Sequence, residues 1–160
     1  MNFNHFNSSG EAVMVDVSAK EPTLRRAVAS AKVRLTPAIL AAILEGSITK
    51  GDVLGVARLA GIQAAKRTPQ LIPLAHPLAI HHVSIQFTNH EAAGEIDIVA
   101  TVSAFERTGV EMEAMVAASM AALTIYDMCK GSDKRISIEQ VLLLEKDGGK
   151  SGSYRRGGTE

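Results

Sequence analysis

The sequence predicts an α+β fold in which an antiparallel sheet carries its helices on one face. Two observations predict this class. Residues 26–35, 82–87 and 95–105 alternate apolar and polar side chains with the period of two that a half-buried strand requires. Helical signals lie between the first two segments and after the third, so the expected order is βαββαβ with an extra short helix near the N-terminus.

The first two helices have clear starts. Thr36 followed by Pro37 predicts a short helix, because a threonine oxygen caps backbone N–H groups and proline fits the first turn. Asp52 can cap a second helix that runs to about Lys66. The residues before the first strand predict a flexible arm over 1–12.

The middle of the chain predicts an extended segment and a hairpin. Three prolines within residues 68–78 oppose a continuing helix, so this segment is expected to be extended. The turn signal at residues 89–94 joins the second and third strands into an antiparallel hairpin.

Residues 109–130 carry the longest helical signal and predict the core helix. Neither glycine nor proline interrupts them after Gly109, and small and aliphatic residues dominate, so the helix is apolar on most sides. Thr108 and Glu111 have the spacing of a capping box, which predicts a start near Gly109. A last strand over 136–145 completes the order, which is the ferredoxin-like pattern.

The charges on this helix allow two interpretations. Glu113 and Asp127 are 14 residues apart, so they share a face but lie about 21 Å apart along the axis. They cannot contact one small ligand. Asp127 and Lys130 are three residues apart and can form either an ordinary ion pair or an acid/base pair.

Composition excludes several classes of protein. Lys plus Arg equals Asp plus Glu at 17 each, and aromatic residues make up only 4% without tryptophan, which argues against a nucleic-acid binder. The single cysteine, Cys129, excludes an internal disulfide and a cysteine-rich zinc site, so a cytoplasmic location is expected. No apolar run is expected to span a membrane. We also expect one domain over residues 1–160, with a mobile Gly/Ser-rich tail over 147–160.

Many cations lie in loops and at helix ends, and such a set suits a polyphosphate ligand. They are Arg25, Lys50, Lys66, Arg67, His76, Lys130, Lys146 and Lys150. Taken alone, each of the lysines is better explained by a solvated surface, and His76 by a half-buried structural histidine. The GGKS sequence at 148–151 lacks the earlier glycine and the following helix of a phosphate loop. His81, His82 and His90 have no partners at metal-ligand spacing, so no metal site is expected.

Five blocks in order carry a resemblance over nearly the whole chain. They are MVDVSAK (14–20), KGDVLGVARLAGIQAAKRTPQLIPLAHPL (50–78), TGVEMEAM (108–115), LTIYDMCK (123–130) and GGKSG (148–152). By these blocks the chain closely resembles the MoaC family of molybdenum-cofactor (molybdopterin) biosynthesis. The resemblance implies a lyase that converts (8S)-3′,8-cyclo-7,8-dihydro-GTP to cyclic pyranopterin monophosphate and releases pyrophosphate. It implies no metal or other cofactor, and a substrate supplied by a radical-SAM GTP cyclase.

The resemblance also implies roles for particular residues. The positions that match catalytic ones are Asp127, Lys130, Lys50 and His76. Those that match substrate-binding ones are Leu74, Ala75, His76, Met112 and Glu113. Beside these matches, Glu111 is a further candidate for substrate binding, and Arg25, Lys66, Arg67, Lys146 and Lys150 are further candidates for the phosphates. Many relatives carry cysteine where this chain has Ala75, so a thiol there is not expected to be essential.

The assembly that the resemblance implies would explain how Glu113 and Asp127, far apart on one helix, can act in one site. The resemblance implies a homohexamer, a trimer of dimers, with the site at a subunit interface. Asp127 with Lys130, and His76 with Glu113, are then expected to come from different subunits. The alternative hypothesis is a non-catalytic ferredoxin-like module that binds a phosphorylated ligand.

Overall fold

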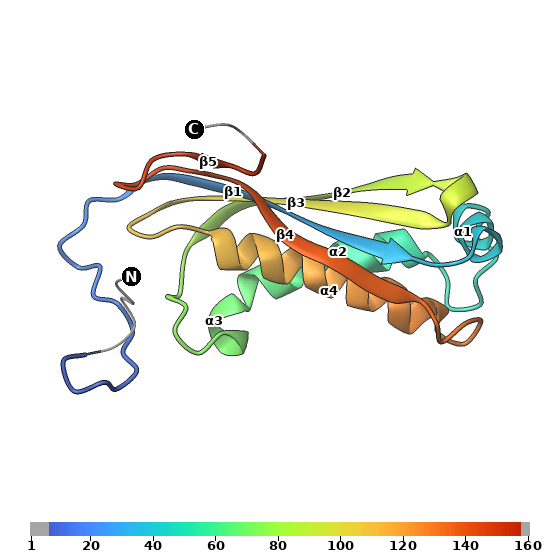
Figure 1. Cartoon of the computed structure of the whole chain (residues 1–160), viewed down its shortest axis with the longest axis horizontal. Helices are drawn as coiled ribbons and strands as arrows, with labels where there is room; N and C mark the ends of the chain where they lie inside the picture. The colour runs from blue at the N-terminus through green and yellow to red at the C-terminus, as the bar shows by residue number, and fades with distance from the viewer. Residues whose placement is uncertain (1–6, 158–160) are drawn as a thin grey trace.

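The predicted ferredoxin-like fold is confirmed by a computed structural model that describes residues 7–157 (Figure 1). The strands are β1 (Thr23–Arg34), β2 (Ile80–His90), β3 (Glu95–Glu106), β4 (Ser137–Asp147) and β5 (Tyr154–Arg155). They form one antiparallel sheet in the order β2-β3-β1-β4-β5. The two halves of the chain therefore interleave, and β1 lies between β3 and β4.

The helices are α1 (Pro37–Leu44), α2 (Val53–Lys66), α3 (Thr68–Leu71) and α4 (Glu111–Cys129), and a single 3₁₀ turn, η1 (Glu91–Ala93), joins β2 to β3. The two long helices, α2 and α4, pack on one face of the sheet, as predicted, and α1 lies at the end of the sheet beside η1 (Figure 1). The two predicted caps are confirmed. Thr36 accepts a hydrogen bond from the Ile39 N–H, and Asp52 accepts one from the Gly55 N–H.

Two local predictions were wrong. Residues 68–71 form a helical turn, α3, because Pro69 sits in its first turn, where a missing N–H costs no helical hydrogen bond. The capping box at Thr108 does not form, since Val110 is the N-cap of α4 and no side chain caps it. Glu111 instead forms an ion pair with Lys146, with 3.0 Å between Oε1 and Nζ.

The segment after β4 is more ordered than its composition indicates. Tyr154 and Arg155 pair with β4 as the short strand β5. The predicted arm over 1–12 lies partly outside the described residues. The mobility of the arm and of the tail stays a prediction.

Helix α4 is the core helix, as predicted. Its alanines have no exposed surface, because α4 packs between the sheet and α2, and they are Ala114, Ala117, Ala118, Ala121 and Ala122. Against our expectation from the sequence, α4 is long and apolar enough to span a bilayer, with 19 residues and a mean hydropathy of 1.2. Half of that stretch is buried inside the protein, which is typical of a core helix.

Helices α2 and α4 approach each other closely at Gly61. A Cβ atom at this position would lie 2.8 Å from the carbonyl oxygen of Ala117 and would overlap the side chain of Ile85. The absence of a side chain at Gly61 therefore lets the backbones of the two helices touch.

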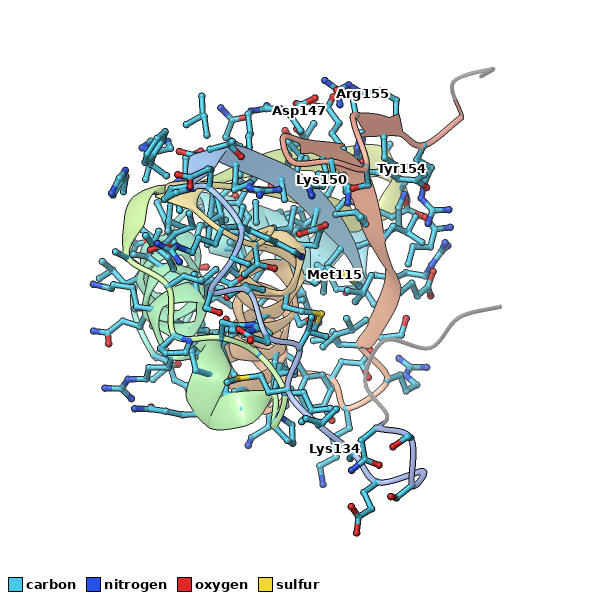
Figure 2. All side chains as sticks on the ribbon, turned by 90° about the vertical axis from the view of Figure 1, so that its left-hand side faces the viewer. Met115, Lys134, Asp147, Lys150, Tyr154 and Arg155 are labelled. Atoms are coloured by element: carbon cyan, nitrogen blue, oxygen red, sulfur yellow. The ribbon has the colours of Figure 1, made fainter. Side chains whose placement is uncertain are left out.

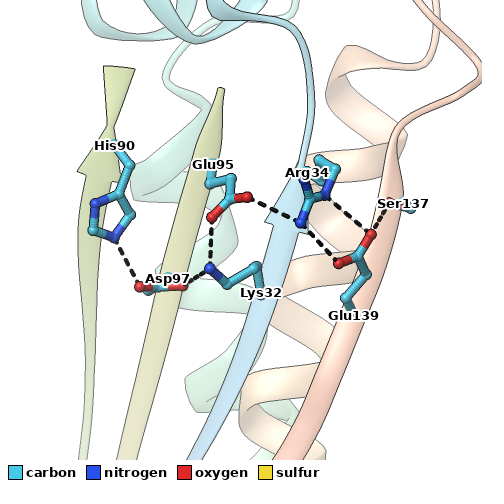
Figure 3. Close-up of polar contacts among 7 residues, drawn as sticks. All are labelled: Lys32, Arg34, His90, Glu95, Asp97, Ser137 and Glu139. Carbon is cyan, nitrogen blue, oxygen red and sulfur yellow. Dashed lines mark hydrogen bonds and ion pairs between the residues drawn. The ribbon is translucent and has the colours of Figure 1, made fainter. Parts of the chain in front are cut away.

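The face of the sheet opposite the helices carries ion pairs (Figure 3). Lys32 Nζ lies 2.6 Å from Glu95 and 3.3 Å from Asp97, and Arg34 bridges Glu95 and Glu139. The hydrogen bond to Glu95 is the main cause that raises the pKa of Lys32. Because such partly exposed pairs add little stability each, this cluster mainly gives the open face a polar surface.

Candidate active site

The N-terminal end of α4 faces a cavity of about 400 Å³, which we call the first cavity. Its walls come from four segments: the chain before β1, the loop before β2, the loop after β3 and the first turn of α4. The lining residues are Val15, Val17, Lys20, Leu74, Ala75, His76, Leu78, Thr108, Gly109, Glu111, Met112 and Glu113. All six residues predicted to bind substrate in the 74–76 and 111–113 blocks therefore meet in one place.

Two titratable side chains line the first cavity in different environments. His76 is half-buried, and its Nε2 lies 2.7 Å from the backbone carbonyl oxygen of Val15. Glu113 is only 3% exposed. Burial, assisted by the neighbouring charge of Glu111, raises the pKa of Glu113 to about 7. Glu113 can therefore hold or release a proton near neutral pH, as a general acid or base must.

The raised pKa of Glu113 makes stability depend on pH. The folded carboxyl binds its proton more tightly than the unfolded one, so the stability from protonated Glu113 is complete below about pH 4.5 and is lost as the pH rises through about 7. Glu113→Gln, which stays neutral, should raise the free energy of unfolding at pH 8 by about 1–3 kcal/mol and leave it nearly unchanged at pH 4, where the wild-type carboxyl is protonated in both states. Urea titrations at both pH values measure this.

The control is Glu91→Gln, in the exposed turn η1. We expect it to change stability by less than about 0.5 kcal/mol at either pH. A Glu113→Gln protein that is no more stable than wild type at pH 8 would contradict the raised pKa.

A second, larger cavity of about 710 Å³ adjoins the first, and we call it the cationic cavity. The two share Lys20, Thr108, Gly109 and Glu111 as lining residues. Basic side chains gather in the cationic cavity: Lys20, Arg25, Arg107, Lys146 and Lys150. Three of these, Arg25, Lys146 and Lys150, were predicted as phosphate-binding candidates. Figure 2 looks onto this end of the molecule and shows Lys150 near the chain that carries β5.

Arg25 is held rigidly at the cationic cavity. It is 9% exposed, and it donates from Nε to the Glu106 carbonyl at 3.0 Å and from Nη2 to the Arg107 carbonyl at 3.1 Å. Gly149 packs against it with a φ of +81°, and a Cβ there would overlap the guanidinium group. Two glycines in the loop after β4 thus let the C-terminal chain fold over Arg25, since Gly148 also has a positive φ.

The C-terminal end of α4 carries a separate cluster of charges. Asp127 lies between two ammonium groups, 2.6 Å from Lys130 Nζ and 3.3 Å from Lys50 Nζ, and Lys50 also donates to the Asp127 carbonyl at 2.8 Å. The hydrogen bond from Lys130 is the largest cause that lowers the pKa of Asp127, and the hydrogen bond from Lys50 is the second. Asp127 in turn raises the pKa of Lys130. At neutral pH the cluster is a carboxylate flanked by cations.

The predicted site residues therefore form two groups within one chain. His76, Glu113 and three of the phosphate candidates, Arg25, Lys146 and Lys150, lie at the N-terminal end of α4. Asp127, Lys130 and Lys50 lie at its C-terminal end. Lys66 and Arg67 are exposed at the end of α2 and line neither cavity.

Sequence reasoning did not single out several residues of the two cavities. The sequence did not indicate that Lys20 and Arg107 contribute cations to the cationic cavity, or that Val15 and Val17 line the first cavity. Lys20 ends the MVDVSAK block and Arg107 precedes TGVEMEAM, so adjacency to the blocks was the available signal. Within residues 7–157, no three His, Cys, Asp or Glu side chains lie close enough together to hold a metal ion.

Comparisons with known proteins agree with this arrangement of motifs. The model of the MoaC family matches residues 14–149. A cyclic pyranopterin monophosphate synthase of Geotalea uraniireducens is 70% identical over 156 residues, which cover 98% of each chain. The synthase of Pelobacter propionicus is 68% identical over the same shares, and that of Chloroflexus aurantiacus is 53% identical over 95% of this chain and 93% of its own. The chain belongs to the MoaC family.

Proposed function

We propose that this chain is a lyase that converts (8S)-3′,8-cyclo-7,8-dihydro-GTP to cyclic pyranopterin monophosphate and releases pyrophosphate, in molybdenum-cofactor biosynthesis. The observation that carries the proposal is the contact between the two cavities at Lys20, Thr108, Gly109 and Glu111. One cavity offers acid/base groups and the other offers cations. A substrate with a reacting ring at one end and a triphosphate at the other requires both.

The cationic cavity suits the triphosphate. A cyclic monophosphate forms when a substrate hydroxyl displaces pyrophosphate at the α-phosphorus, so negative charge accumulates on the leaving group. Arg25 is fixed by two backbone carbonyls and needs no rearrangement to meet this charge. Lys146 is held between Glu111 and Ser151, at 3.0 Å from each, and it can exchange the Glu111 contact for a phosphate.

The ring rearrangement needs proton transfers at more than one position. In this proposal Glu113 and His76 supply groups at the N-terminal end of α4, and Asp127 with Lys130 and Lys50 supplies a carboxylate and two ammonium groups from the other end. Asp127 is ionised and can accept a proton, and the adjacent Lys130 carries one to donate. Because their contact lowers the pKa of Asp127 and raises that of Lys130, substrate must weaken this contact before either transfer becomes favourable.

A second copy of the chain brings the two groups together in this proposal. A groove of about 340 Å³ on α4 and α3 is lined by Leu71, Ile72, Met112, Met115, Val116, Ser119, Met120 and Leu123. Leu71, Met112 and Leu123 are 39–51% exposed, which is unusual for a cluster of large apolar side chains on a free surface. Figure 2 shows Met115 on the side of α4.

Antiparallel pairing of two such grooves would join the half-sites. Met120 lies midway between Glu113 and Asp127 in the sequence, so a two-fold axis near it places Asp127 of each copy at the first cavity of the other. Three such pairs would make the hexamer that the family resemblance implies. We further propose that a radical-SAM GTP cyclase supplies the substrate and that the protein acts in the cytoplasm.

The test is turnover of the cyclised dihydro-GTP substrate, followed as pyrophosphate release and pterin formation. We expect wild type to form both products in equal amounts without added metal. The competing function is a module that only binds a phosphorylated ligand. Saturable binding of the substrate with neither product formed would favour that module and contradict the lyase.

A further inference from the structure

The chain before β1 closes over the first cavity as a strap, which we define as residues 13–20. The strap is held at two points outside its own residues. The Val15 carbonyl lies 2.7 Å from His76 Nε2, and the Ser18 carbonyl accepts a hydrogen bond from Arg107 Nη1. Val15 and Val17 line the first cavity beside His76. The strap therefore forms part of the site rather than a loose terminus.

The contact with Val15 determines which ring nitrogen of His76 carries a fixed proton. A backbone carbonyl oxygen accepts hydrogen bonds and cannot donate one. Nε2 must therefore be the donor in the neutral ring and also in the protonated ring. Within residues 7–157 no hydrogen bond to Nδ1 is found. Nδ1 is thus the nitrogen that can gain and lose a proton.

The backbone that carries His76 is fixed independently. Pro77 has no N–H group, and the Ala79 N–H donates to the carboxylate of Glu106 at 3.0 Å. The main-chain carbonyl of Glu106 also accepts from Arg25. One residue at the end of β3 therefore connects the loop of His76 to the cationic cavity. Because the loop is anchored on one side, the strap needs to set only the rotation of the ring.

The geometry points to Val15 as a positioning residue that acts through its carbonyl to restrict proton transfer by His76 to Nδ1. This inference rests on the proposed function, since it assumes that His76 handles a proton of the substrate. The bond between that proton and the substrate breaks, and Nδ1 of the neutral ring accepts the proton. The ring is then an imidazolium with both nitrogens protonated. The same Nδ1–H later returns the proton to substrate, and Nε2–H stays on Val15 throughout.

Two substitutions of His76 distinguish the role of Nε2 from that of Nδ1. The amide nitrogen of glutamine can occupy roughly the place of Nε2, whereas that of asparagine falls nearer Nδ1. His76→Gln should keep the bond to Val15 and His76→Asn should lose it, and neither can transfer the proton. We expect both variants to lose at least about 100-fold in kcat.

Hydrogen exchange of the strap amides distinguishes His76→Gln from His76→Asn. The amides of Ser18 and Lys20 are hydrogen-bonded within the strap, to Asp16 and to the Val17 carbonyl, and they report its order. In wild type and His76→Gln these amides should exchange at similar rates, and in His76→Asn about ten-fold faster. Equal exchange in all three proteins would overturn the inference. If wild type forms no product but the exchange pattern holds, the contact stands and the proposed function fails.

A pair of deletions tests the role of the strap without changing His76. Deletion of residues 2–12 keeps Val15, and deletion of residues 2–17 removes it. We expect kcat to fall by about 10- to 100-fold only with the longer deletion, because a misplaced reacting group slows the chemical step. KM should change less than about three-fold. Circular dichroism checks that both proteins fold, and equal kcat values for two folded deletions would overturn the inference.

Discussion

Asp127→Asn should reduce kcat by at least about 1,000-fold while leaving substrate affinity within a few-fold of wild type. Asparagine has nearly the same shape as aspartate. Its one amide oxygen can still accept a hydrogen bond from Lys130, which lies 2.6 Å from the carboxylate, and Lys50 keeps its 2.8 Å hydrogen bond to the main-chain carbonyl of residue 127. Asparagine cannot take up a proton, however, and general base catalysis contributes about 100- to 10,000-fold. Pyrophosphate release under saturating substrate measures kcat, and equilibrium binding of substrate measures affinity.

The matched control is Glu139→Gln. Glu139 is also a carboxylate paired with a cation, Arg34, and hydrogen bonds from Ser137 and then Arg34 lower its pKa. It lies on the sheet face opposite the helices (Figure 3). We expect activity within about two-fold of wild type, since surface ion pairs contribute little. An Asp127→Asn protein that keeps more than a tenth of wild-type kcat would remove Asp127 from the proposed chemistry.

Two inactive variants should restore activity when they are combined in one assembly. Asp127→Asn damages the half-site at one end of α4, and His76→Gln damages the half-site at the other. In a two-fold pair of one subunit of each kind, one site has both substitutions and the other has neither. Random mixing makes half of the pairs mixed, so we expect about a quarter of wild-type activity from proteins that are each almost inactive. Co-expression with two affinity tags isolates the mixed assemblies.

A second mixture provides the control. His76→Gln and Glu113→Gln change the same end of α4, so every site in their mixed pairs contains one substitution. We expect no recovery there. If the mixture of Asp127→Asn and His76→Gln also shows none, the site does not span two subunits as proposed.

Local signals explain why most of the fold could be predicted from the sequence. Thr36 and Asp52 cap α1 and α2 through residues three positions away, so their effect does not depend on the rest of the chain. Thr108 does not cap α4, because Glu111, its expected partner, forms an ion pair with Lys146 in β4. That contact depends on the tertiary structure. The strand β5 also escaped prediction, since pairing at a sheet edge depends on tertiary position and not on the two residues themselves.

The site could be predicted in part. Family motifs indicated His76, Glu113 and Asp127, and helix geometry indicated that a single chain keeps Glu113 and Asp127 apart. The contact between the two cavities was not predictable, because it depends on how the chain before β1 folds over the loop after β3. Lys20 and Arg107 enter the site only through that folding.

The close approach of α2 and α4 at Gly61 has a consequence for the electrostatics of Asp127. Because the backbones touch there, the two helices form one rigid body, and Lys50, which precedes α2, is held against the end of α4 before any substrate arrives. The dipoles and charges around the carboxylate are therefore preorganised, and little reorganisation energy is added to the barrier when a proton moves. A larger side chain at Gly61 would slow the reaction from within the core, through a residue that never meets the substrate.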